Sequence, residues 1–467
     1  MTRTSHASGR VSGSTNRAKR GLALRPSWGP GFRLALALLP LLSSLHGLPI
    51  AAESQSYPAI LPEADPFLAS LGAATLAAGP GAVPSLDDLI EAGLRASGVA
   101  TQDLSARKAA VNGILDSMAA ALREGNLTSR AEQALEWLHT QRLLGVYSER
   151  ATTLVDILDS RCFNCVSSAN LYLLAMRRLD IACGAVQTPD HAFCIVRIDG
   201  KAIDVETTNR YGFDPGTRRE FTDSFGKATG YNYVPPGAYS KRNQIGPLAL
   251  VALILSNRSA MYEESHRYQD SLTLAVSYVA LVPGPAGLDF VVGRINNRCA
   301  ELSQAGTWSE MRSLALAGRE RYGNLPALAK LAAEAQDSYL ASIIDTKPLS
   351  EAAKLVLAAA ASGDITMSRR NEFIVYLYGS EANRIGARGD WLAAAALAES
   401  GSALIGGGSR LSQAAANYYH NYAAGVHNRF AELYNAGKRT QARAVLQEGL
   451  AALPGDPLLT RDLSALQ

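Results

Sequence analysis

The chain has 467 residues, of which 47% are apolar, 19% charged and 7% aromatic. This composition is typical of a globular protein and excludes wholesale disorder and fibrous structure, and five cysteines are too few for a disulfide-built miniprotein. The formal net charge of +3 is an N-terminal feature: residues 1–52 hold seven of the 45 Lys and Arg and no acidic residue, which leaves 38 basic against 42 acidic residues elsewhere. Such a mildly acidic body gives no electrostatic basis for nucleic-acid binding.

Residues 34–48 form an apolar run that follows a basic stretch and precedes the small residues Ala51 and Ala52. This order is typical of a secretory signal peptide. We therefore predict a signal peptide over residues 1–52 and a mature protein that is periplasmic or secreted. An uncleaved anchor is disfavoured because the run has fifteen residues and contains Pro40, whereas a spanning helix needs roughly 20 apolar residues. No later stretch is long enough, so we expect no integral membrane segment after cleavage.

Residues 53–84 are rich in Pro, Gly and Ala and poor in charge, which predicts a linker. From residue 85 to 159, leucine and isoleucine recur at helical spacing, which predicts a helical lead-in. Ser129 and Glu132 have the spacing of a capping box and predict the start of a helix at that point.

Residues 161–235 change in character and predict an α+β arrangement. We expect an amphipathic helix from Cys165 to Leu179, followed by strands over 183–187, 191–198 and 201–207. Asp199-Gly200 between the last two strands is a strong signal for a two-residue hairpin turn. Residues 209–240 are expected to form an ordered wall or loop, whose aromatic side chains line a cleft or seal the core: Tyr211, Phe213, Phe221, Tyr231 and Tyr233.

From residue 247 to 467 the chain is Ala- and Leu-rich and predicts helices almost throughout. Small residues, a tyrosine and a closing proline recur at related offsets, which is typical of a helix–turn–helix repeat. The four sets are Ser259, Tyr262, Ser271 and Pro283; Gly306, Met311, Ala315 and Gly318; Gly389, Ala394 and Ala398; and Gly437, Ala442, Leu446, Gly449 and Pro454. We predict a solenoid of degenerate tetratricopeptide-like repeats that offers a face to a protein partner. The alternative is an all-helical packing domain without a ligand.

Candidate chemistry lies between residues 161 and 208. Cys165 opens the expected helix, where the positive end of the helix dipole favours a nucleophilic thiolate. His191 stands at the head of a strand, in a suitable place for a general base beside the thiol. A carboxylate on the next strand would orient the imidazole.

Two carboxylates on that strand are candidates for the orienting acid, Glu206 and Asp204. If Asp199-Gly200 is a two-residue turn, Asp204 lies opposite Ile195 and both carboxylates share a face with His191, because side chains alternate along a strand. Glu206 is nearer to His191 along the ladder, so we prefer Glu206 and keep Asp204 as the alternative.

The combination of Asn164-Cys165 at a helix start, His191 opening a strand and Glu206-Thr207-Thr208 closing a hairpin resembles the transglutaminase-like core, over about residues 135–235. The resemblance implies a papain-like fold, in which an N-terminal helix carries the nucleophile and packs on a small antiparallel sheet that carries the histidine and the acid. The sequence departs from the usual pattern in two places: Glu206 stands where Asp is usual, and Phe193 is the aromatic residue near His191 where Trp is usual. Fusion to tetratricopeptide-like helices is similar to exported bacterial members of this group.

Other interpretations of the cysteines and histidines remain open. Cys162 and Cys165 form a C-x-x-C pair, which suggests a redox site, or a zinc site completed by Cys183 and His191. A disulfide in the Cys162–Cys165 pair would block a nucleophile. If the turn near Pro189 places them opposite each other, Cys183 and Cys194 could form a cross-strand disulfide in an oxidising compartment. His420 and His427 are seven residues apart on one helical face, which is weak evidence for a metal site.

These features predict a domain with a helical lead-in over residues 85–240 and a helical-repeat domain over 247–467. The predicted function is that of an exported cysteine protease, amidase or transglutaminase-type acyltransferase, which acts on amide bonds of a protein or peptide. No metal or organic cofactor is expected, and no calcium-binding loop is visible. The alternative is a non-catalytic exported scaffold, in which the papain-like core is a binding module.

Overall fold

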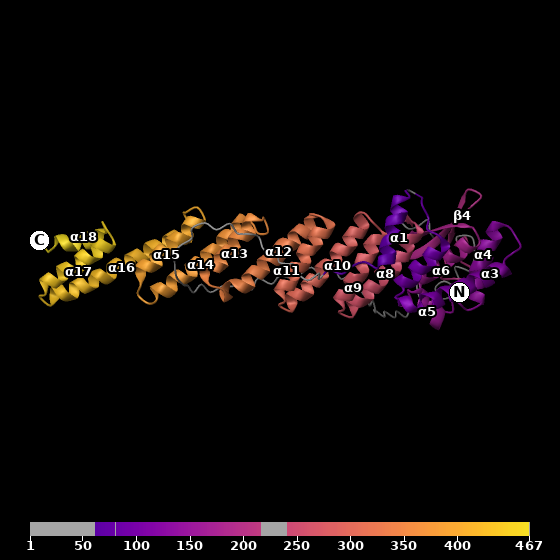
Figure 1. Cartoon of the computed structure of the whole chain (residues 1–467), viewed down its shortest axis with the longest axis horizontal. Coiled ribbons are helices and arrows are strands. Elements are labelled where there is room, and N and C mark those ends of the chain that lie inside the picture. Colours follow the sequence, from indigo (N-terminus) through magenta and orange to yellow (C-terminus); the bar gives the residue numbers. More distant parts are fainter. Residues whose placement is uncertain (1–60, 80, 216–240, 467) are drawn as a thin grey trace, which may run out of the picture. The chain divides into compact units, whose positions relative to one another are not determined.

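The computed structural model describes residues 61–79, 81–215 and 241–466. The predicted signal peptide (1–52), residues 53–60 of the predicted linker, and Phe221, Tyr231 and Tyr233 of the predicted wall lie outside these residues. The described residues belong to one compact unit that is mostly helical and contains a small antiparallel sheet (Figure 1). The expected α+β class with an all-helical C-terminal half is confirmed.

Residues 66–77, which were expected to belong to a linker, instead form the helix α1 (Pro66–Ala77). The side chain of Asp65 caps it by accepting the backbone N–H of Leu68 at 3.0 Å, and Leu68 is buried in the main core. The helix packs closely on α9 (Tyr268–Leu281), since a side chain at Gly72 would collide with a backbone carbonyl of α9. The linker prediction was wrong here because small residues, which suggested irregular structure, instead allow this close approach.

The predicted helical lead-in is present, but one of its helices begins earlier than predicted. It consists of α2 (Leu86–Ala96), η1 (Thr101–Asp103), α3 (Leu104–Ala121), α4 (Leu127–Thr140) and α5 (Leu154–Ser160). The N-cap of α4 is Asn126, whose side chain accepts the N–H of Ser129 at 2.9 Å. The predicted capping box at Ser129 and Glu132 was therefore wrong, because asparagine caps a helix as well as serine does.

The helix α6 (Cys165–Arg178) lies at the centre of this part of the molecule (Figure 1). Every residue from Val166 to Met176 is buried. The prediction of an amphipathic helix was therefore wrong, because the helix is covered on all sides. It contacts the helices α2 to α5 and α8 (Pro247–Glu264), together with two strands of the sheet. The core is therefore continuous across the predicted domain boundary near residue 240, because α8 packs in the same apolar cluster as α6.

The sheet has four antiparallel strands in the order β5-β4-β3-β6. The strands are β3 (Ala182–Gln187), β4 (Ala192–Ile198), β5 (Lys201–Val205) and β6 (Asn243–Ile245). Asp199 and Gly200 form the predicted two-residue turn, with φ of 51° and 74°, and Ile198 lies opposite Lys201 as expected. A second, parallel sheet pairs β1 (Val146–Tyr147) with β2 (Cys162–Phe163).

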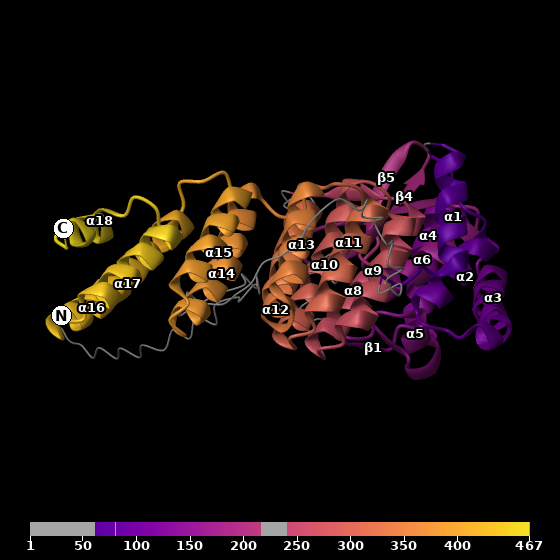
Figure 2. The same ribbon diagram turned by 60° about the vertical axis from the view of Figure 1, so that its left-hand side comes forward.

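After β6 the chain is helical, and consecutive helices pack side by side (Figure 2). After α8 and α9, the elements are α10 (Pro285–Gln304), α11 (Trp308–Tyr322), α12 (Pro326–Ile343), η4 (Ile344–Thr346), α13 (Leu349–Ala361), α14 (Met367–Gly386), α15 (Trp391–Leu404), α16 (Arg410–Asn435), α17 (Arg439–Ala452) and α18 (Pro457–Ser464).

The four helix–helix connections within the predicted repeats share one turn geometry, which Gly98 after α2 and Gly363 after α13 also adopt. They join α8 to α9, α10 to α11, α14 to α15 and α16 to α17. Each turn contains a residue with positive φ, followed by a residue whose N–H donates to the carbonyl five positions earlier. Three of the positive-φ residues are the glycines that suggested repeats in the sequence, and a histidine takes the place in the first turn: His266, Gly306, Gly389 and Gly437. The repeated spacing of small residues therefore corresponds to a repeated helical hairpin.

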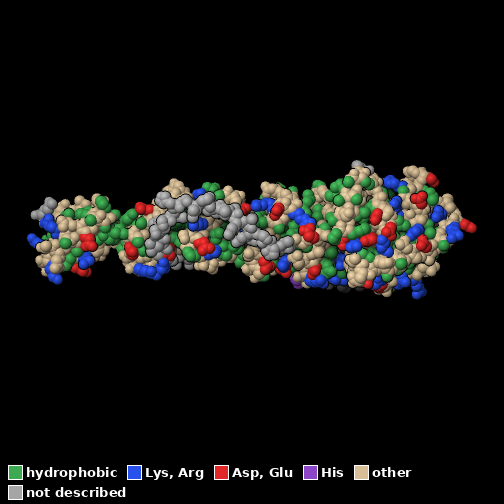
Figure 3. Space-filling model, viewed as in Figure 1, with side chains coloured by type: hydrophobic (Ala, Val, Ile, Leu, Met, Phe, Trp, Pro, Cys, Tyr) green, Lys and Arg blue, Asp and Glu red, His purple; other side chains and the backbone are tan. Residues whose placement is uncertain are grey.

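No helix among the described residues is both long and apolar enough to cross a bilayer. On the face shown in Figure 3, acidic and basic side chains are interspersed.

Candidate functional site

The start of α6 is held in place by a cap that uses both ends of one side chain. Asn164 is the N-cap, and its Oδ1 accepts the N–H groups of Val166 at 2.9 Å and Ser167 at 3.1 Å. Its Nδ2 donates to the carbonyl of Glu149 at 2.9 Å. Cys165 is the first residue of the helix and is half-buried. The thiol therefore lies at the positive end of a 14-residue helix whose first turn is rigidly positioned.

His191 lies immediately before β4, in the turn between β3 and β4. Its carbonyl accepts the N–H of Thr188 at 2.9 Å and the hydroxyl of Thr188 at 3.1 Å, which closes the turn. The imidazole side chain is only 15% exposed.

Glu206, and not Asp204, contacts this histidine. The distance between His191 Nε2 and Glu206 Oε2 is 2.6 Å. The other carboxylate oxygen, Oε1, accepts the N–H of Thr208 at 3.1 Å and its hydroxyl at 2.7 Å. The buried carboxylate thus has partners on both oxygens, and Glu206 lies just beyond the last residue of β5.

Asp204, the alternative acid, has a different partner. It lies opposite Ile195 in the sheet, as the predicted register requires. Its carboxylate accepts two hydrogen bonds from Arg242, at 2.8 and 3.0 Å, and the Arg242 guanidinium lies 5.2 Å from the ring centre of Phe193. Asp204 is thus committed to an ion pair beside the sheet.

The electrostatic environment of His191 and Glu206 favours the charged form of both side chains. Burial of the ring lowers the pKa of His191, but the charge of Glu206 and the hydrogen bonds with Cys165 and Glu206 outweigh burial and raise this pKa to about 12. Burial raises the pKa of the Glu206 carboxyl, but the charge of His191 and the hydrogen bonds from His191 and Thr208 outweigh burial, so this pKa is lowered. An imidazolium beside Cys165 is the partner that a thiolate requires.

One ring nitrogen of His191, Nε2, is bonded to Glu206. The Cys165 thiol is also near enough to the imidazole to raise its pKa. One imidazole thus lies beside both a thiol and a carboxylate, which is the combination that an activated cysteine nucleophile with an oriented base needs.

The remaining cysteines are thiols and not disulfides. The register that would place Cys183 opposite Cys194 was wrong by two residues, since Ala185 lies opposite Cys194 and Val196 lies opposite Cys183. The turn before His191 is longer than assumed, and it shifts the pairing. Cys162 is also a thiol, so nothing in the structure blocks Cys165 by a bond within the C-x-x-C pair.

The histidine and cysteine side chains do not form the metal sites that the sequence left open. Over residues 61–79, 81–215 and 241–466, no cluster of three or more His, Cys, Asp or Glu side chains is placed to hold a metal ion. His427 Nδ1 is bonded to the buried carboxylate of Asp462, which joins α16 to α18, and His420 is exposed on α16.

Two aromatic residues of the predicted wall, Tyr211 and Phe213, lie within the described residues, and one of them is buried in the core. Phe213 is buried and bridges to Val205 at the end of β5. Tyr211 is half-buried, and the guanidinium of Arg210 lies 4.7 Å from its ring centre.

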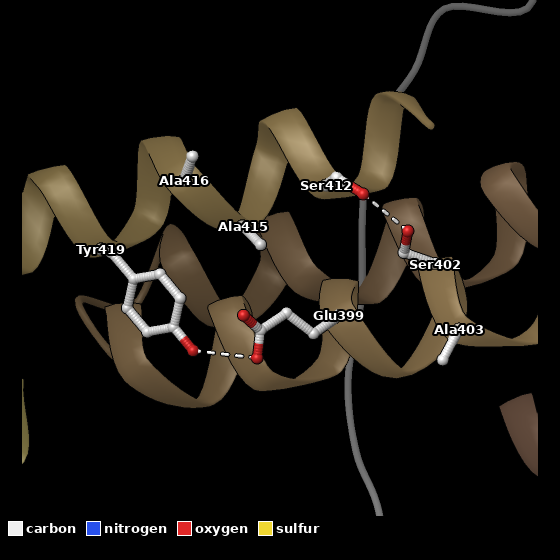
Figure 4. A pocket seen from close by; sticks show the side chains of 7 residues that line it. All are labelled: Glu399, Ser402, Ala403, Ser412, Ala415, Ala416 and Tyr419. Carbon is white, nitrogen blue, oxygen red and sulfur yellow. Dashed lines mark hydrogen bonds between the residues drawn. The ribbon is translucent and has the colours of Figure 1, made fainter. Parts of the chain in front are cut away.

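Two surface hollows lie away from the Cys165–His191–Glu206 group. One, of about 360 Å³, is lined by residues of α1, the following loop, and the ends of α8 and α9. The other, of about 270 Å³, lies between α15 and α16 (Figure 4). Its polar side chains satisfy each other: Glu399 accepts a hydrogen bond from Tyr419, and Ser402 is bonded to Ser412 (Figure 4).

Two residues close to the site, His139 and Ser168, were not identified from the sequence, and neither were their contacts with Thr207 of the Glu206-Thr207-Thr208 motif. His139 Nε2 lies 3.1 Å from the carbonyl oxygen of Thr207, and the hydroxyls of Ser168 and Thr207 are 2.7 Å apart. These contacts join segments that are 68 and 39 residues apart, so no local pattern indicates them.

No protein-family model matches the chain, and comparisons with curated proteins and with solved structures also give no match. The geometry of the Cys165–His191–Glu206 group is therefore the basis for assigning a function.

Proposed function

We propose that this protein is a cysteine-dependent acyl-transfer or hydrolysis enzyme with a transglutaminase-like, papain-like core, which acts on amide bonds of a protein or peptide. The observation that carries the proposal is the position of His191, whose Nε2 lies 2.6 Å from Glu206 Oε2 and whose pKa is raised by Glu206 and by the neighbouring Cys165. Further support comes from Cys165 at the start of a buried helix that packs on an antiparallel sheet.

The proposed reaction proceeds through a thioester. The Cys165 thiolate forms a bond to the amide carbonyl carbon, and the His191 imidazolium gives its proton to the amine nitrogen as the carbon–nitrogen bond breaks. Water or a second amine then attacks the thioester, while His191 takes a proton from the attacking group and the thiolate leaves. Glu206 keeps His191 in its productive orientation and stabilises its charged form.

The backbone N–H of Cys165 is a donor for the oxyanion in this scheme. It belongs to the first turn of α6, where N–H groups have no partner inside the helix. Asn164 satisfies the next two N–H groups, those of Val166 and Ser167. The N–H of Cys165 is thus the one that a developing negative charge on the substrate would use.

The test is the reactivity of Cys165 in the full-length protein. After mild reduction, the protein is treated with iodoacetamide over a range of pH, and labelled peptides are quantified by mass spectrometry. We expect Cys165 to be alkylated much faster than its half-buried neighbour Cys162 at pH 6, and His191→Ala to abolish this difference. Equal labelling of Cys162 and Cys165 across the pH range would refute an activated nucleophile.

A substrate test follows from the same variants. Wild type and Cys165→Ala are incubated with a protein substrate and a primary-amine probe. Peptide release indicates hydrolysis, and probe incorporation indicates transfer to an amine. We expect Cys165→Ala to lose either activity while its circular dichroism spectrum is unchanged.

The helical hairpins of α8–α17 favour an accompanying role in binding a protein partner or the substrate, since repeated hairpins of this kind offer extended binding surfaces. Export is part of the same proposal and rests on the sequence of residues 1–52. If Cys165 proves unreactive, the alternative is an exported scaffold in which the α6–sheet core is a binding module.

A further inference from the structure

The segment that carries Glu206 is fixed by contacts outside the Cys165–His191–Glu206 group. Thr207, the next residue, is fully buried. Its carbonyl oxygen lies 3.1 Å from His139 Nε2, and its hydroxyl lies 2.7 Å from the hydroxyl of Ser168. The residue that follows the acid is therefore held both through its backbone and through its side chain.

The two partners of Thr207 come from elements that also position the nucleophile. Ser168 is on α6, three residues after Cys165, and its hydroxyl lies 3.4 Å from the carbonyl of Cys165. The Ser168–Thr207 bond thus links the helix that carries the thiol directly to the segment that carries the carboxylate.

His139, near the end of α4, contacts both sides of the site. Its ring packs edge-on against Phe163, two residues before Cys165, with ring centres 5.8 Å apart. Burial lowers its pKa to about 4, against the opposing effect of hydrogen bonds with the backbone of Thr207 and Leu144, and Arg210 lowers it further. The ring is therefore neutral at physiological pH, and the Nε2–H tautomer donates to the Thr207 carbonyl.

We propose that His139 and Ser168 are positioning residues, which hold Thr207 and so fix Glu206 and His191 relative to Cys165. This inference rests on the proposed function of Cys165 as a nucleophile. It goes beyond that function because it assigns a role to His139 and Ser168, whose hydrogen bonds are with Thr207 and the Cys165 carbonyl and not with the thiol or the imidazole. Displacement of a catalytic group by about 1 Å lowers reaction rates by about 100-fold, so the hydrogen bonds to Thr207 have a measurable consequence.

The experiment compares four test variants and one control variant of the full-length protein. Ser168→Ala and Thr207→Val remove the hydroxyl pair, and the latter keeps the shape of the side chain. His139→Leu removes the donor to the Thr207 carbonyl, whereas His139→Gln keeps an N–H donor. His420→Gln, on the exposed face of α16, is the matched control.

The main readout is the pH profile of iodoacetamide labelling at Cys165. We expect about 10- to 100-fold slower labelling near pH 6 and a shifted profile in Ser168→Ala, Thr207→Val and His139→Leu. Partial recovery is expected in His139→Gln, and no change in His420→Gln. Folded variants that keep the wild-type profile would overturn the proposal, and so would His139→Gln behaving like His139→Leu.

A second readout does not depend on Cys165 reactivity. The short bond between His191 and Glu206 should give a downfield ring-proton signal in the NMR spectrum of the wild type, identified by its absence in Glu206→Gln. Loss or broadening of this signal in Ser168→Ala and His139→Leu supports positioning, and an unchanged signal contradicts it. If wild-type Cys165 is unreactive but the signal responds in this way, the proposed enzyme function fails while the role of the two positioning residues stands.

Discussion

Asp204 and Glu206 are two residues apart, but their carboxylates have different partners. Asp204 is half-buried and paired with Arg242, a permanent cation, whereas Glu206 is buried and paired with a histidine whose charge depends on its proton. An acid that orients a general base must be bonded to that base. Of the two acids, only Glu206 therefore has the contact that the proposed orienting role requires, and Asp204 is paired with Arg242 instead.

Replacement of the two acids by their amides should separate these roles. Glu206→Gln removes the charge that keeps His191 protonated, so we expect loss of fast Cys165 labelling and a decrease of about 2 kcal/mol in unfolding free energy near pH 6. Asp204→Asn weakens a partly exposed ion pair, which costs at most about 1 kcal/mol, and should leave the labelling profile unchanged. Equal effects of the two variants on labelling would contradict the assignment.

The stability difference between wild type and Glu206→Gln should depend on pH with a defined sign. The folded-state pKa of His191 is raised, so its contribution is fully present below about pH 6.5 and is lost as pH rises towards 12. The folded-state pKa of Glu206 is lowered, so its contribution is present above about pH 4.3 and is lost as pH falls further. Denaturant titrations should give the largest difference between about pH 5 and 6 and a smaller one at pH 9.

The contact between His191 and Glu206 could be predicted from the sequence better than the contacts that surround it. One turn signal, Asp199-Gly200, fixes the β4–β5 register and places Glu206 towards His191. The β3–β4 register has no comparable signal, and the register that would place Cys183 opposite Cys194 was wrong by two residues. His139 could not be linked to Thr207, because a contact across 68 residues depends on tertiary packing alone.

At the scale of single elements, the cap of α6 controls the position of the thiol. Asn164→Ala removes two acceptor contacts and the bond to the Glu149 carbonyl. We expect a loss of about 1 kcal/mol in stability together with slower labelling of Cys165, measured by urea unfolding and mass spectrometry.

The control is Asn126→Ala, which removes a single N-cap hydrogen bond from the exposed start of α4. It should cost a similar free energy and leave Cys165 labelling unchanged. Slower labelling in both variants would indicate general destabilisation and not a local effect of the α6 cap.

Two glycines in the helical hairpins should respond oppositely to alanine. A side chain at Gly401 on α15 would overlap Tyr378 and lie 2.9 Å from Leu411, whereas Gly425 on α16 has open space around it. We expect Gly401→Ala to destabilise the α14–α16 region by about 1–3 kcal/mol through overpacking. Gly425→Ala should stabilise its helix by about 0.5–1 kcal/mol. Hydrogen exchange of peptides from α14 to α16 measures both, and a neutral Gly401→Ala would contradict close packing at this site.

Elements were predictable where periodicity or turn chemistry is strong. The helices after residue 247 and the β4–β5 hairpin follow from such patterns. The helix α1 and the strand β6 do not: α1 is rich in small residues that suggested a linker, and β6 is only three residues long. Both are stabilised by contacts with distant segments, α1 with α9 and β6 with β3.

At the scale of the whole molecule, the apolar core is divided unevenly. One large cluster joins residues of α1 to α6, the sheet, α8 and α9. The helices α10 to α18 contribute to smaller, separate clusters. The last cluster has five buried members, Ala423, Phe430, Ala442, Leu446 and Leu459. Since each hairpin is stabilised mainly by its neighbours, stability should differ along the chain.

Native-state hydrogen exchange should therefore reveal separate opening of the C-terminal hairpins. We expect amides of α17 and α18 to exchange at lower denaturant than those of α6 and β4, because their cluster buries less apolar surface. Leu446→Ala should cost about 2–5 kcal/mol locally and accelerate exchange in α16 to α18, while α6 and the labelling of Cys165 stay unchanged. Uniform loss of protection across α6 and α17 would instead mean that the described residues unfold as one cooperative unit, and that the α6 site depends on the last hairpin.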